Sequence, residues 1–357
     1  MLDRRRFLAL LTAAAAAQAC GTVGTPSRPT PPGTSEPPDE LDAIAEKILS
    51  GGPPPDGIPP IEKPQYVSAA EASLQWKDDA VVEGLVVDGQ PRAYPRFITV
   101  WHEIVNETIA GRPVAITYCP LTGSAVVFAA ELSDGRQTTF GTSGKLYNSN
   151  LVMYDRATTS MWPQLLGVAV SGERKGERLR ELPLAVTTTF GRWKARHPDT
   201  VVLSTETGHL RTYGSWPYGD YDTSSGIMFP VEPRDERYHP KAVVVGVRAG
   251  GEALAIPKEE FAARRVANVD VGGEPLVALH DPALESIRVF RRDTGRGQLR
   301  FALRGDAVID EQTGSRWSPE GHAADGELAG VALAPVVAYD VMWFAWFGFN
   351  PATKVLA

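Results

Sequence analysis

The second half of this chain repeats residue types of the first half in the same order. Matched positions recur after roughly 160 residues, and self-similarity at such a period indicates a duplicated structural unit. The matches include Gly84 with Gly246, Pro95 with Pro257, Asn106 with Asn268, Ser124 with Ser286, and Trp162 with Trp317. Because both copies have to satisfy one fold, we predict a tandem internal duplication of a small domain, with the copies packed around a pseudo-twofold axis.

Within each copy, short apolar runs alternate with Gly and Pro turns, a pattern typical of β-strands. Two segments have helical spacing instead, Arg96 to Val105 and Thr188 to Arg196, and a proline at 198 stops the second. A chain with 43% hydrophobic residues can bury a sizeable core. We therefore predict an α+β, β-rich fold whose copies span residues 66–203 and 241–357.

Two further segments lie outside the copies. Residues 21–65 are rich in proline and glycine, so we predict a spacer that cannot bury enough surface to fold. Residues 204–240 join the copies and place many aromatic side chains among Gly, Pro and Asp. Such a composition predicts an ordered connector that packs on the two copies rather than a free linker.

The first 20 residues have the composition of an export signal. A run of arginines precedes a short apolar stretch and the small-residue site Ala17-Gln18-Ala19. The leading R-R-x-F-L resembles a twin-arginine signal, and Cys20 stands where a lipobox would be lipidated. We expect an exported, periplasmic or otherwise extracytoplasmic protein, which contacts a membrane only through an N-terminal lipid anchor.

The net charge and the motifs exclude several classes of protein. A formal charge of -7 at pH 7 argues against a nucleic-acid partner, which would recruit Lys and Arg. The sequence has no Gly-rich phosphate loop, nucleotide fingerprint or G-x-S-x-G elbow. The remaining partner is a small molecule or a component of the cell envelope.

Reactive side chains that occur in only one copy are the better functional candidates. The first copy alone has His102 and Cys119, whereas the Asp-Thr-Ser-Trp set at 155–162 recurs at 310–317 and is predicted to be a structural turn. With Cys20 in the leader, Cys119 has no disulfide partner. An imidazole and a thiolate can bind copper or zinc, and a His can deprotonate a Cys to give a nucleophile.

We therefore place a candidate site at Cys119 and His102, as a catalytic pair or as metal ligands. The predicted ligand-binding residues around them are Tyr118, Asn148, Asn150 and Gln164, which suit a small polar molecule. The alternative is a non-catalytic envelope module in which Cys119 is buried and inert. The sequence leaves open whether the protein is an enzyme.

The same residues resemble a bacterial family known as domain of unknown function 3179. The resemblance rests on the segments Trp101-His102-Glu103-Ile104-Val105-Asn106, 117–123, 140–155 and Trp343-Phe344-Ala345-Trp346. The family often carries a second Cys where this chain has Thr122, so the resemblance does not extend to a two-Cys site here. It implies no established activity.

Overall fold

The computed structural model describes residues 38–183, 185–295 and 297–356. The predicted export signal and its lipidation candidate Cys20 lie outside these residues. Among the described residues there are six helices and six β-sheets, which confirms the predicted α+β, β-rich fold class. Within the same part of the chain, no helix is long and apolar enough to cross a membrane.

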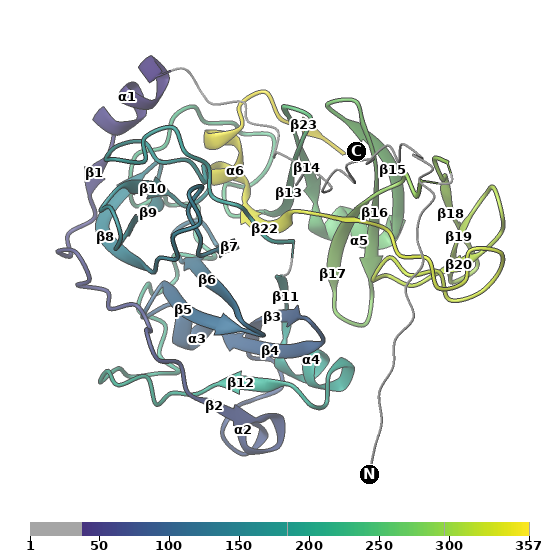
Figure 1. The fold of residues 1–357 in the computed structure, drawn as a ribbon, viewed down its shortest axis with the longest axis horizontal. Coiled ribbons are helices and arrows are strands. Elements are labelled where there is room, and N and C mark those ends of the chain that lie inside the picture. Colours follow the sequence, from purple (N-terminus) through teal and green to yellow (C-terminus); the bar gives the residue numbers. More distant parts are fainter. Residues whose placement is uncertain (1–37, 184, 296, 357) are drawn as a thin grey trace, which may run out of the picture. The chain divides into compact units, whose positions relative to one another are not determined.

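Three sheets form the first half (Figure 1), with strand orders β11-β3-β4-β12-β2, β5-β6-β7 and β1-β8-β9-β10. The strands are β1 (Leu49–Ser50), β2 (Tyr66–Ser68), β3 (Val81–Val87), β4 (Gln90–Pro95), β5 (Ile104–Ile109), β6 (Arg112–Cys119), β7 (Ser124–Ala129), β8 (Phe140–Tyr147), β9 (Asn150–Asp155), β10 (Met161–Pro163), β11 (Val186–Thr189) and β12 (Val201–Leu203). The helices are α1 (Pro38–Glu46), α2 (Ala69–Gln75), α3 (Arg96–Thr99) and α4 (Phe190–Arg196).

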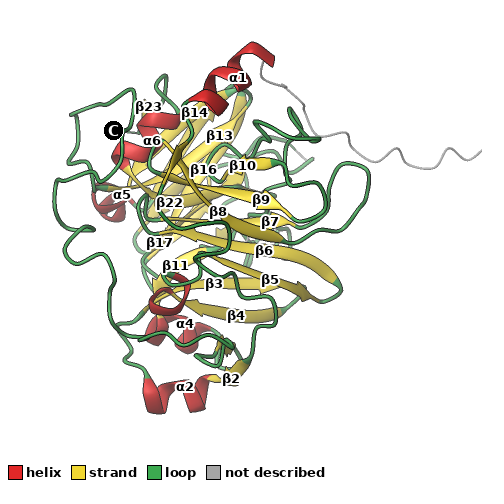
Figure 2. Ribbon diagram, turned by 90° about the vertical axis from the view of Figure 1, so that its left-hand side faces the viewer, coloured by secondary structure: helices red, strands yellow, loops and turns green. Residues whose placement is uncertain are grey.

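The second half also has three sheets, with orders β22-β13-β14-β23, β15-β16-β17-β21 and β18-β19-β20. Its strands are β13 (Val243–Ala249), β14 (Glu252–Pro257), β15 (Val266–Val271), β16 (Glu274–Asp281), β17 (Ser286–Arg291), β18 (Phe301–Arg304), β19 (Ala307–Asp310), β20 (Arg316–Trp317), β21 (Pro335–Val336), β22 (Ala338–Met342) and β23 (Lys354–Val355). Its helices are α5 (Lys258–Arg264) and α6 (Trp343–Phe349). Helices α2 and α4 lie against strands of the sheet β11-β3-β4-β12-β2, and α6 lies against β13 and β22 (Figure 2).

The two halves have matching strand orders. The order β11-β3-β4-β12 has its counterpart in β22-β13-β14-β23. Along these four matched strands, the first pair is antiparallel and the last pair is parallel in both halves. A duplication would produce this agreement; the duplication and its pseudo-twofold axis stay predictions.

Buried tryptophans occupy equivalent places in the two halves. Trp193 packs over Gly84 and Trp346 over Gly246, and at each glycine a Cβ atom would lie 2.3 Å from the indole ring. Any larger side chain would therefore displace the ring. Gly84 and Gly246 are thus required by close packing, as their recurrence in the sequence indicates.

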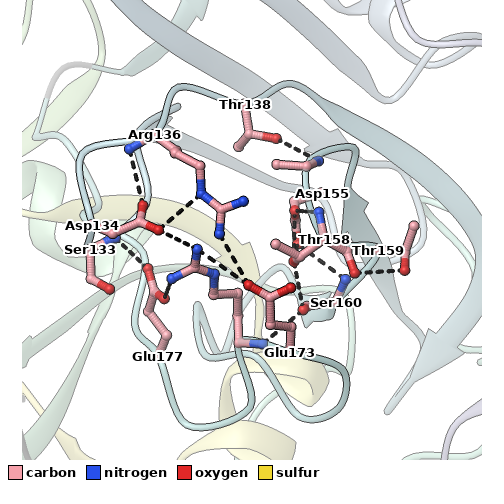
Figure 3. A network of polar contacts seen from close by, with 12 residues as sticks. Ser133, Asp134, Arg136, Thr138, Asp155, Thr158, Thr159, Ser160, Glu173 and Glu177 are labelled. Carbon is pink, nitrogen blue, oxygen red and sulfur yellow. Dashed lines mark hydrogen bonds and ion pairs between the residues drawn. The ribbon is translucent and has the colours of Figure 1, made fainter.

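The Asp-Thr-Ser-Trp turn forms in both halves, as predicted. In the first, the Asp155 carboxylate accepts hydrogen bonds from Thr158 N at 2.6 Å, Ser160 N at 3.1 Å and Trp162 Nε1 at 2.9 Å. The second half repeats the contacts to Thr313 N and Trp317 Nε1 through Asp310. Figure 3 shows the first turn beside charged side chains that include Arg136, bonded to Asp134 and Glu173. The carboxylate satisfies buried donors, so its role is structural.

The predicted helix from Arg96 to Val105 is wrong in its length. Helix α3 ends at Thr99, and the chain then turns until Glu103, whose φ is 59°. The C-cap of α3 is Val100, and the left-handed Glu103 prevents any continuation of the helix, so Ile104 begins β5 directly afterwards, opposite Thr117. The apolar residues after Thr99 therefore belong to a turn and a strand.

Residues 38–65 differ from the expected spacer because they pack on the first half. Leu49 pairs with Leu146 of β8, and the fully buried Ile61 donates its N–H to Ile104 O at 2.9 Å. A proline-rich segment can be held in this way, since its few N–H groups and its carbonyls find partners on neighbouring strands. In the connector 204–240, Tyr221 is only 3% exposed and its hydroxyl donates to Leu121 O at 2.9 Å.

Candidate functional site

The β6–β7 hairpin carries the motif that contains Cys119. Cys119 is the last residue of β6 and pairs with Ser124, the first residue of β7. The turn between them closes through Thr122 N to Cys119 O at 3.3 Å, and Gly123 adopts a φ of 61°. A left-handed position favours glycine, so the sequence correctly predicts a sharp reversal that holds Cys119 at the end of a strand.

Beneath this turn lies a network of fully buried polar side chains. Gln164 donates to Thr117 Oγ1 at 2.8 Å and accepts from Ser124 Oγ at 2.9 Å and from Asn150 Nδ2 at 2.8 Å. Asn150 also donates to Thr122 Oγ1 at 3.1 Å. All five residues have zero exposed area. The predicted ligand-binding amides Asn150 and Gln164 therefore bond to the protein and fix the turn.

The thiol of Cys119 is 1% exposed. Its Sγ accepts the N–H of Leu151 at 3.4 Å and lies 3.9 Å from Ser149 O. Burial, together with the nearby Glu103 carboxyl, raises the pKa of Cys119 to about 11. The thiolate is the nucleophile and the metal ligand, so Cys119 is in its unreactive form at neutral pH.

His102 is fully buried and bonds to two other segments. Its Nδ1 donates to Pro59 O at 2.7 Å, because a carbonyl can only accept. Its Nε2 then accepts the Tyr213 hydroxyl at 2.6 Å. Burial lowers the pKa of His102 to about 4, which keeps the ring neutral. His102 thus links residues 38–65, through Pro59, and the connector, through Tyr213, to the first half.

The structure does not bring His102 and Cys119 together through a hydrogen bond, since the bonding partners of each lie in other segments. Among the described residues, no group of three or more His, Cys, Asp or Glu side chains is arranged to hold a metal ion. Both ring nitrogens of His102 have hydrogen-bond partners, so ligation of copper or zinc by His102 would break one of these bonds, and metal binding stays a prediction.

Two other predicted ligand-binding residues lie apart from the thiol. The Arg96 guanidinium carbon lies 4.8 Å from the centre of the Tyr118 ring, and the two residues line a cavity to which Cys119 does not contribute. Asn148 donates to Gly348 O at 2.9 Å and to Glu232 O at 3.0 Å. Asn148 therefore joins β8 to α6 and the connector, and it does not line a pocket with Asn150 and Gln164.

The carboxyl of Glu103 lines a cavity of about 290 Å³, which we call the Glu103 pocket. The side chains around it include Leu121, Lys145, Leu151, Tyr218 and Phe229. Glu103 is 7% exposed, and in the described part of the chain no hydrogen bond reaches its carboxyl. Burial raises the pKa of Glu103 to about 8. A carboxylic acid that is protonated near neutral pH and faces a pocket can donate a hydrogen bond to a ligand.

Sequence reasoning missed Glu103 as a functional residue, although a signal was present. The repeat aligns Glu103 with Arg265, and both have left-handed backbones, with φ of 59° and 63°. The backbone conformation is therefore common to both halves, and only the side chain differs. A polar residue that is buried in one half and replaced by an arginine in the other meets the criterion that selected His102 and Cys119.

Comparison with known proteins gives one result. No curated protein and no solved structure matches the chain significantly. The sequence model of one family, described as "Protein of unknown function (DUF3179)", matches residues 55–353. That span includes the β6–β7 hairpin, the buried polar network and Glu103 itself, whereas Gly51 and Pro53 of the pocket lining lie just before it. The chain therefore belongs to the DUF3179 family, as its motifs indicate.

Proposed function

We propose that this chain is an exported protein that binds a small molecule in the Glu103 pocket and exchanges a proton with it through Glu103. One observation carries the proposal: a carboxyl with a pKa of about 8 lines a cavity and has no hydrogen-bond partner among the described residues. A group whose pKa lies near the working pH is effective as both proton donor and proton acceptor.

The walls of the pocket indicate the class of ligand. Leu121, Leu151 and Phe229 supply apolar surface, and Lys145 is an exposed cation at the same cavity. An apolar pocket with few polar groups is typical of small-molecule sites. The arrangement favours a small, mostly apolar compound with a carbonyl or hydroxyl group that meets the Glu103 carboxyl.

A second candidate function is binding without chemistry. It is favoured by the burial of Cys119, which keeps the thiol protonated and therefore unreactive. The copper, zinc and Cys-His forms of the site have no support in the placement of His102. The two remaining functions share the Glu103 pocket and differ in whether the ligand is altered.

The test is a ligand-observed NMR screen of small neutral carbonyl and hydroxyl compounds at about pH 6, where Glu103 is protonated. We expect compounds that bind the wild type to lose binding to Glu103→Ala and to keep binding to Glu103→Gln, whose amide still donates. Conversion of a bound compound should stop in Glu103→Gln if the protein is an enzyme. Arg265→Ala, at the equivalent backbone position, is the control. Compounds that bind Glu103→Ala and the wild type equally well would contradict the proposal.

A further inference from the structure

A second cavity, of about 390 Å³, lies on the other side of the end of β6. Its lining includes Arg96 and Tyr118 from the first half, Trp216 and Asp222 from the connector, and Lys241 and Met342 from the region that follows it. Successive residues of a strand point to opposite faces, and of the last two residues of β6 only Tyr118 lines this cavity. The two cavities have no lining residue in common.

The cavity is rich in hydrogen-bond donors with unused capacity. Trp216 Nε1 and Arg96 Nε are both buried and have no hydrogen-bond partner. Lys241 is 6% exposed, and its ammonium lies 3.2 Å from the centre of the Tyr221 ring and donates to Tyr221 O. An ammonium has three donors, so two of them lack a carbonyl or carboxylate acceptor here. Unfilled buried donors are costly, and a ligand that accepts hydrogen bonds would satisfy them.

The charges around the cavity limit the ligand to a single negative charge. Arg96 is paired with the buried Glu83, and Asp340 is paired with Lys258. Burial lowers the pKa of Lys241 to about 8, and the exposed Asp222 opposes this shift. Lys241 is thus a cation at neutral pH without a bonded carboxylate. A dianion would be repelled by Asp222, which lines the cavity, whereas the charge of Asp340 is compensated by Lys258.

We propose that this cavity is a second ligand site, which binds a small organic monocarboxylate through Lys241, Arg96 and the indole N–H of Trp216. Phe97, Val243 and Met342 supply an apolar wall for the remainder of the molecule. Arginine and lysine are the residues that recognise carboxylates, and a buried site strengthens each bond. The site is independent of the Glu103 pocket.

The test is calorimetric titration of the full protein at about pH 7 with benzoate, acetate and inorganic phosphate as probes. We expect one saturable benzoate site, weaker binding of acetate, which lacks an apolar body, and weakest binding of phosphate. Trp216→Phe keeps an aromatic ring and removes the indole donor together with some apolar volume, so benzoate affinity should fall about tenfold. Lys241→Met should reduce it by more than tenfold.

Two variants serve as matched controls. Trp101→Phe removes an indole N–H that is also buried without a partner, and Lys354→Met removes an exposed lysine paired with Glu252. Neither residue lines the cavity, so benzoate affinity should be unchanged in both. Absence of saturable benzoate binding, tighter binding of phosphate, or equal affinity in Trp216→Phe and wild type would overturn the proposal. If Lys241→Met does not fold, the Trp216→Phe and Trp101→Phe pair still decides.

Discussion

The ends of β6 and β16 occupy equivalent places in the two halves, but different interactions stabilise them. Cys119 pairs with Ser124 across one hairpin, and Asp281 pairs with Ser286 across the other. Asp281 caps its own turn by accepting Ala283 N at 2.9 Å and Leu284 N at 3.2 Å. Cys119 has a thiol in place of this carboxylate, and a sulfur atom is a weaker hydrogen-bond acceptor for the turn.

The first hairpin depends on buried side chains from distant strands instead. Gln164 and Asn150 hold the Thr122–Ser124 segment from beneath. The left-handed residue just before β5 and the one just before β15 also have different partners. Arg265 pairs with the exposed Asp306 at 2.9 Å, whereas Glu103 faces a pocket without a partner. The comparison teaches that hairpins at equivalent places in the two halves are stabilised differently, by a carboxylate cap within the turn in the second half and by buried side chains from elsewhere in the first.

The largest expected effect comes from Glu103→Gln. The folded-state pKa of Glu103 is raised from 4.5 to about 8, so its contribution to stability is fully present below about pH 4.5 and is lost as the pH rises to about 8. Glutamine cannot ionise, so above pH 8 the variant should be more stable than wild type by about 5 kcal/mol. Urea unfolding across this pH range measures the difference. Arg265→Gln should show no such gain, and parallel curves for wild type and Glu103→Gln would contradict the account.

Asn150→Ala should break the support of the first hairpin. The change leaves Leu165 N and the side chains of Gln164 and Thr122 short of partners in a closed interior. We expect a loss of about 3 kcal/mol in the free energy of unfolding, measured in urea at neutral pH. The half-buried Asn148 is the control, and Asn148→Ala should cost about 1 kcal/mol. Equal losses would show that the network is not special.

His102→Gln sharpens the role of the buried ring. The pKa of His102 is lowered from 6.5 to about 4, so its stabilising contribution is present above about pH 6.5 and is lost as the pH falls to about 4. Relative to the variant, wild type should therefore lose about 2 kcal/mol between these two pH values. The exposed His322 provides the control, as His322→Gln. A wild type that keeps its full advantage at pH 4 would show that His102 is accessible to solvent protons.

The smallest effect is expected at the thiol. Cys119 should react with a small thiol reagent only when the protein unfolds, because it is 1% exposed and its pKa is raised to about 11. Labelling measured by intact mass in native buffer and in denaturant compares the two states. Rapid native labelling would restore Cys119 as a candidate nucleophile and exclude an inert thiol.

Local features of the sequence predict the hairpin well. The apolar run before Cys119, Pro120 and Gly123 together specify strand, reversal and strand, and β6 and β7 follow that pattern. The same reasoning overextends α3, since the apolar residues after Thr99 are compatible with both a helix and a strand. Local pattern cannot distinguish the two where a left-handed residue intervenes.

Contacts between distant residues explain the remaining differences at the site. His102 bonds to Pro59 and Tyr213, and the second of these lies 111 residues away along the chain. The spacing of residues along a single sequence does not reveal such a contact. The predicted pairing of His102 with Cys119 therefore rests on the chemistry of the two side chains alone. The composition of residues 38–65 likewise does not predict their packing, because backbone groups are the same in every residue type except proline.

The central claim is that Glu103 is a protonated carboxylic acid in a pocket of the first half. It is tested most directly by titrating the protein with its glutamates labelled at the carboxyl carbon with ¹³C, and by assigning the Glu103 resonance from its absence in Glu103→Gln. The account predicts a midpoint of about 8. A midpoint near 4.5, the ordinary value for a glutamate, would contradict it.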